Sequence, residues 1–144
     1  MRILILVVSF LILGLNTQPV SANNPIITNV PNDVNNYIMT TGVANYVPVM
    51  IMTGAEMKKE EGQKFGEFQI VIYGAAVKQF ADKEEGQKLV NMAKEAGVTI
   101  VLCEFALKHM GIERESLPEG LEYVHNAFKY NLNMKTKGFI VLSV

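Results

Sequence analysis

The chain has 144 residues, 49% of them hydrophobic, with 13 Lys and Arg against 14 Asp and Glu and a formal net charge of −1. Nearly balanced charges that form no basic stripe argue against nucleic acid as a partner. The single cysteine excludes a fold stabilised by disulfides within the chain. The length suits one domain with a core of its own.

The N-terminal residues have the pattern of a secretory signal peptide. Arg2 precedes an apolar stretch, Ile3–Leu13, that is too short to span a bilayer, and Val20-Ser21-Ala22 supplies small residues before a cleavage site. We predict that residues 1–22 are removed by cleavage after Ala22. The alternative is an uncleaved membrane anchor. Cleavage predicts a periplasmic or secreted protein that is no longer attached to a membrane.

The mature chain is predicted to begin with a loose arm and to continue as one domain. Residues 23–35 are rich in Asn and Pro and are predicted to form the arm, so the domain spans residues 36–144. Asn36–Thr40 is predicted as the first strand. Pro48 suits the first turn of a helix, where its missing N–H is not needed, and this helix is predicted to run through Met57.

Two nearly all-apolar segments predict strands that are buried on both faces. One is Phe68–Tyr73, which ends at Gly74 and is followed by a predicted short helix over Ala75–Phe80. The other is Val98–Leu102. Such runs are typical of parallel sheets, whose two faces are covered.

A longer helix is predicted between these two strands. Asp82, with Glu85 three residues later, has the spacing of a capping box, and Gly97 is the expected terminator. Four apolar residues between them lie close to one helical face: Leu89, Val90, Ala93 and Ala96.

The C-terminal part is predicted to contain two helices and two strands. These are a short helix over Phe105–Met110, a brief strand over Leu121–Val124, a helix over Ala127–Thr136 and a last strand over Phe139–Leu142. In the helix that begins at Ala127, three side chains are expected to face inward: Phe128, Tyr130 and Leu132.

The regular alternation of strands and helices predicts the fold class. It indicates an α/β three-layer sandwich, with a mostly parallel central sheet and helices on both faces. Ligands of such sheets gather at the carboxyl ends of the strands. Gly74 and Cys103 each follow a predicted strand, so they are expected along one rim if those strands are parallel neighbours.

Cys103 lies where a predicted strand gives way to a predicted helix. A thiolate is the nucleophilic form of cysteine, and the free N–H groups and dipole of a helix N-terminus stabilise it. The neighbouring carboxylate of Glu104 opposes this effect, because it disfavours a second negative charge. This position alone leaves two interpretations open: a reactive thiol, or a small buried hydrophobic side chain.

Three segments carry a family resemblance: "IVIYGAAVK" (Ile70–Lys78), "GVTIVLCEFALKHMGI" (Gly97–Ile112) and "KGFIVL" (Lys137–Leu142). With them the chain resembles the DsrE/DsrF-like family of small sulfur-handling proteins. The resemblance implies an α/β fold, assembly into trimers or hexamers, and a cysteine that carries sulfane sulfur as a persulfide. Cys103 matches the sulfur-carrying position, and Tyr73 and Gly74 match the loop expected to face it.

The leading hypothesis is an exported DsrE-like protein that binds or relays sulfur. Cys103 would be the sulfur-accepting thiol, and four candidate substrate-binding residues surround it: Tyr73, Gly74, Glu104 and Phe105. The expected partners are further copies of the chain and a protein that donates or accepts sulfur. Such a protein is a carrier rather than a turnover enzyme.

Two other classes remain open. One is a non-catalytic, oligomeric module for assembly or small-ligand binding, in which Cys103 is buried packing. The other is an enzyme, such as a thiol-dependent transferase, which needs a base or oxyanion donors near the thiol. The sequence identifies no such group.

No metal or cofactor is predicted. Cys103, His109 and His125 have a spacing that fits no compact zinc motif. "GAAVK" (Gly74–Lys78) lacks the further glycines of a phosphate-binding loop.

Overall fold

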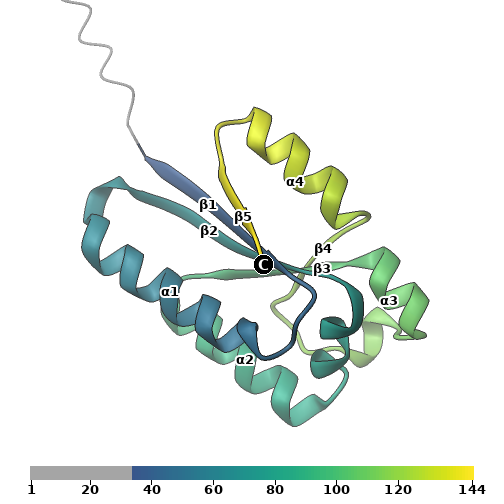
Figure 1. Ribbon diagram of the computed structural model, residues 1–144. Helices are drawn as coiled ribbons and strands as arrows, with labels where there is room; N and C mark the ends of the chain where they lie inside the picture. The colour runs from purple at the N-terminus through teal and green to yellow at the C-terminus, as the bar shows by residue number, and fades with distance from the viewer. Residues whose placement is uncertain (1–33) are drawn as a thin grey trace, which may run out of the picture. The chain divides into compact units, whose positions relative to one another are not determined.

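The computed structural model describes residues 34–144, so the predicted signal peptide and nearly all of the predicted arm lie outside the described residues. Five strands form one sheet in the order β4-β3-β2-β1-β5 (Figure 1). They are β1 (Asn35–Thr41), β2 (Phe65–Ile72), β3 (Thr99–Cys103), β4 (Glu122–Val124) and β5 (Ile140–Ser143). All four neighbouring pairs are parallel, which confirms the predicted α/β fold.

Four α-helices accompany the sheet: α1 (Tyr46–Glu61), α2 (Lys83–Ala96), α3 (Glu104–Met110) and α4 (Ala127–Thr136). The described residues also form three 3₁₀ helices: η1 (Gly62–Lys64), η2 (Gly74–Phe80) and η3 (Arg114–Ser116). The short helix predicted over Ala75–Phe80 is the 3₁₀ helix η2. Among residues 34–144, the helices are too short or too polar to cross a membrane.

Helices cover both faces of the sheet, as predicted. Neighbouring residues of a strand point to opposite faces, so Phe68 and Gln69 of β2 mark the two sides. A Cβ added at Gly54 of α1 would lie 3.1 Å from the ring of Phe68, whereas the Tyr130 hydroxyl of α4 donates to Gln69 Oε1 at 2.7 Å. The helices α1 and α4 therefore lie on opposite faces, and α2 packs beside α1 (Figure 1).

The two central strands form the middle of the core. Six residues of β2 and β3 are almost fully buried: Ile70, Val71, Ile72, Ile100, Val101 and Leu102. Because these residues alternate between the two faces, both faces must be covered, which the helical layers on each side achieve.

The ends of α2 follow the predicted signals. The Asp82 carboxylate accepts hydrogen bonds of 3.0 Å from the backbone N–H groups of Glu84 and Glu85. Gly97 ends the helix in a left-handed conformation with φ 71°, which glycine adopts without steric penalty.

Gly86 lets α2 approach η2 closely. A Cβ at this position would lie 2.8 Å from the backbone oxygen of Phe80 and 3.0 Å from Cγ of Pro118. Replacing Gly86 with Ala is therefore expected to lower the free energy of unfolding by about 1–3 kcal/mol, because the added methyl overpacks the contact. This loss opposes the higher helix propensity of Ala.

Urea denaturation of Gly86→Ala measures this difference. The matched control is Lys88→Ala, at an exposed site of the same helix, where the change is expected to stay within about 0.5 kcal/mol. A Gly86→Ala protein as stable as the wild type would show that the helix can move away from Phe80 at little cost.

One prediction about α4 is wrong. Phe128 and Leu132, expected to face the core, are 60% and 68% exposed, while Tyr130 is half-buried as expected. The inward positions are Ala127, Asn131 and Met134. The Asn131 amide donates to Thr40 Oγ1 of β1 at 2.7 Å, so the buried face of this helix contains a polar contact with the sheet.

Candidate functional site

Cys103 ends β3 and is the N-cap residue of α3. Strands β2 and β3 are parallel neighbours, with Ile72 opposite Leu102. The next residues, Tyr73 and Cys103, therefore stand level at the carboxyl rim of the sheet. Gly74 follows with a positive φ of 57°, which turns the chain into η2. Gly74 and Cys103 therefore lie along one rim of the sheet, as expected for residues that follow two parallel neighbouring strands.

The thiol lies beneath the connection between β4 and α4. Cys103 is only 5% exposed, and its Sγ lies 4.0 Å from the backbone oxygen of His125. The same oxygen accepts a hydrogen bond of 3.2 Å from the backbone N–H of Phe105. Within the described residues the Cys103 side chain is buried.

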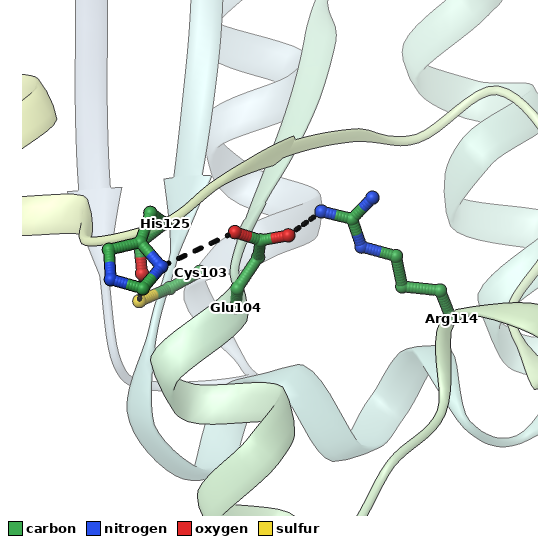
Figure 2. Close-up of polar contacts among 4 residues, drawn as sticks. All are labelled: Cys103, Glu104, Arg114 and His125. Atoms are coloured by element: carbon green, nitrogen blue, oxygen red, sulfur yellow. Dashed lines mark hydrogen bonds and ion pairs between the residues drawn. The ribbon is translucent and has the colours of Figure 1, made fainter.

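A row of charged groups lies directly beside the thiol (Figure 2). The Glu104 carboxylate forms an ion pair with the Arg114 guanidinium through one oxygen. Its other oxygen lies 3.6 Å from Nδ1 of His125. The contact with His125 becomes an ion pair when the imidazole is protonated. Glu104 thus links η3 to the residue that covers the sulfur.

Two aromatic contacts reinforce this row. The Phe105 and His125 rings lie 4.8 Å apart between centroids. The Arg114 guanidinium carbon lies 4.3 Å from the centroid of the Tyr123 ring in β4, a cation–π geometry. Burial raises the pKa of the Tyr123 hydroxyl, and the nearby Arg114 partly opposes that rise.

The predicted site residues fall into two neighbouring groups. Glu104 and Phe105 contact His125 directly. Tyr73 instead packs edge-on against Phe128 in the first turn of α4, with ring centroids 5.0 Å apart. Sequence reasoning placed Glu104 and Phe105 beside the thiol but considered His125 only as a metal ligand.

A shallow groove of about 420 Å³ runs along the outer side of this row. It lies between α3 and η3, and its lining includes Glu104, Leu107, Lys108 and Arg114 but not Cys103. In the described part of the chain, no three His, Cys, Asp or Glu side chains are grouped to hold a metal ion.

Solved structures of several other proteins have this fold. MTH1491 from Methanobacterium thermoautotrophicum, of unknown function, matches with a TM-score of 0.66 and 16% identity over 76% of this chain and 99% of its own. BT1422 from Bacteroides thetaiotaomicron, also of unknown function, matches with a TM-score of 0.57 and 18% identity over 76% and 95% of the two chains.

The ychN protein from E. coli matches with a TM-score of 0.54 and 15% identity, over 76% of this chain and 99% of its own. No protein-family model and no curated protein sequence matches the chain. At these levels of identity, the three likenesses show that the chain shares the fold of MTH1491, BT1422 and the ychN protein.

Proposed function

We propose that this protein is an exported, DsrE-like carrier that binds sulfane sulfur as a persulfide on Cys103. The observation that carries the proposal is the place of the thiol. It stands at the carboxyl end of β3, at the N-cap of α3 and level with Tyr73 on the parallel neighbour. This rim is where α/β sheets place their ligands, and the family resemblance of the sequence puts the sulfur-carrying cysteine there.

The transfer itself needs no oxidant. The Cys103 thiolate attacks the terminal sulfur of a donor persulfide, R–S–SH, and a new S–S bond forms as the donor's S–S bond breaks. The donor leaves as the thiolate R–S⁻, and Cys103 becomes Cys103–S–SH. Passing the sulfur on repeats the exchange with an acceptor thiolate. The attacking group must be ionised and exposed at that moment.

Intact-mass measurement tests the proposal. After incubation with an organic persulfide, the wild type is expected to gain the mass of one sulfur, about 32 Da, and to lose it on reduction. Cys103→Ser is expected to gain nothing. A wild type that gains no mass, or a gain that survives Cys103→Ser, would refute sulfur binding at this thiol.

The 5% exposure of Cys103 favours a second candidate. In it, the protein is a non-catalytic oligomeric module for assembly or small-ligand binding, and the thiol is part of the core. That module would take up no sulfur while folded, so the same mass measurement separates the two candidates.

We further propose that the protein works as a homo-oligomer, a trimer or hexamer, outside the cytoplasm, and exchanges sulfur with a donor or acceptor protein. Exposed apolar side chains along β5 and α1 support self-association: Tyr46, Val49, Ile140 and Leu142. Export predicts that the mature protein begins at Asn23, which the N-terminal sequence of the exported protein tests.

A further inference from the structure

Cys103 is buried against a short connection. The backbone oxygen of His125, which joins β4 to α4, lies 4.0 Å from its Sγ, so this connection forms part of the cover over the sulfur. Strand β4 has three residues and, in the described sheet, lies at the edge and pairs with β3. Short edge elements open locally at lower free energy than central strands. Contacts with residues outside the sheet are therefore expected to hold the β4–α4 connection in place over the sulfur.

That support comes from residues next to the cysteine itself. The Phe105 N–H donates to the His125 oxygen at 3.2 Å, and the Glu104 carboxylate lies 3.6 Å from His125 Nδ1. Arg114 pairs with the same carboxylate and stacks on Tyr123 of β4. Glu104 is the group through which α3, η3 and the β4–α4 connection are joined (Figure 2).

We propose that Glu104 is a latch that holds the β4–α4 connection over Cys103, so that release of its contacts with Arg114 and His125 uncovers the thiol. Release exchanges the partly exposed Glu104–Arg114 ion pair and the Glu104–His125 contact for contacts with water, which is a small free-energy change. The connection can thus open without unfolding the sheet. The use of the uncovered thiol for sulfur transfer rests on the proposed function, whereas the gating does not.

Alkylation of the native thiol by iodoacetamide measures this opening. When the cover recloses faster than the reagent reacts, the rate follows the population of the open state. We define the protection of Cys103 as the alkylation rate of the unfolded chain divided by that of the native protein. Glu104→Gln and Arg114→Gln are each expected to lower this protection about 2- to 5-fold, because each breaks the partly exposed ion pair between Glu104 and Arg114.

Charge alone would give a different pattern. Removing the Glu104 carboxylate favours the thiolate, whereas removing the Arg114 cation disfavours it, so electrostatics move the two rates in opposite directions. Loss of the latch instead raises the alkylation rate in both variants. Measuring the limiting rate at a pH where the thiol is fully ionised removes the remaining influence of charge.

Lys108→Gln is the matched control. It removes an exposed cation of α3 that borders the same groove, and it is expected to leave the protection unchanged. The double variant Glu104→Gln/Arg114→Gln should lose less protection than the product of the single losses, because both substitutions break one shared ion pair. Low urea should change the protection little, because a local opening exposes little new surface.

Two results would overturn the latch. One is an unchanged limiting rate in both Glu104→Gln and Arg114→Gln. The other is a protection that falls with urea as steeply as the global stability, since the thiol would then be exposed only by unfolding. Persulfide loading is measured separately. If the variants change the protection of Cys103 but the protein takes up no sulfur, the carrier is refuted and the latch is kept. If both variants take up sulfur at the wild-type rate and their protection is unchanged, the latch is refuted and the carrier is kept.

Discussion

Native Cys103 is expected to react with iodoacetamide about 100-fold more slowly than the same thiol in the unfolded chain. The physical reason is burial, because the residue is 5% exposed and its sulfur lies under the backbone of His125. Alkylation must wait for the cover to open, and a protection of this size corresponds to an open population of about one molecule in a hundred.

Timed quenching followed by mass spectrometry, in buffer and in concentrated urea, gives the two rates. Cys103→Ser serves as the control for labelling at any other side chain. Equal native and unfolded rates would show that the sulfur is open to water. Complete resistance of the folded protein, even over days, would remove the opening on which sulfur uptake depends and would favour the purely structural cysteine.

The order of the strands and helices could be predicted from local signals. Phe68–Tyr73 and Val98–Leu102 are apolar enough to require cover on both faces of the sheet. In the structure most residues of both segments are buried. The Asp82 cap and the Gly97 terminator set the limits of α2 where the sequence placed them. These signals are contained within a few neighbouring residues, which is why sequence alone was sufficient.

The details of the site depend on contacts between distant segments. Arg114 lies in a polar turn whose sequence gives no hint that it reaches Glu104. The backbone oxygen that lies 4.0 Å from Cys103 Sγ belongs to His125, 22 residues away. The position of β4 at the rim could have pointed to His125, because carboxyl ends of parallel strands meet at one edge.

The wrong prediction for α4 has a similar cause. Phe128 and Leu132 are four residues apart, a spacing that predicts a buried face, but both are exposed. The helix is instead rotated so that Asn131 reaches Thr40 in β1. The buried face thus combines Ala127 and Met134 with a polar pair whose members are 91 positions apart, and hydrophobic periodicity does not register such a pair.

The edge strand β5 leaves an apolar surface uncovered. Ile140 and Leu142 pair with Tyr37 and Met39 of β1, so they share the face of the sheet on which α1 lies. Both are nevertheless more than half exposed, because α1 does not cover β5. Within residues 34–144 no strand pairs with the outer edge of β5, and the backbone groups of such an edge add hydrogen-bonding capacity. This is the surface we expect a second copy of the chain to cover.

Replacing Leu142 with Lys is therefore expected to convert the proposed homo-oligomer into monomers. A charge at the centre of an apolar contact loses apolar burial and must be desolvated, which is expected to weaken association at least about 100-fold. The fold should survive, because Leu142 is 53% exposed within one chain. Light scattering at micromolar concentration, together with circular dichroism, measures both effects.

Leu132→Lys is the matched control, since it places the same charge on another exposed leucine, 68% against 53% for Leu142, in α4 on the opposite face of the sheet. It should leave the oligomer intact. Dissociation by Leu132→Lys but not by Leu142→Lys would move the interface to α4, next to Phe128 and the rim that holds Cys103. A wild type that scatters only as a monomer would refute self-association through either face, and Cys103 would then have to be uncovered within a single chain.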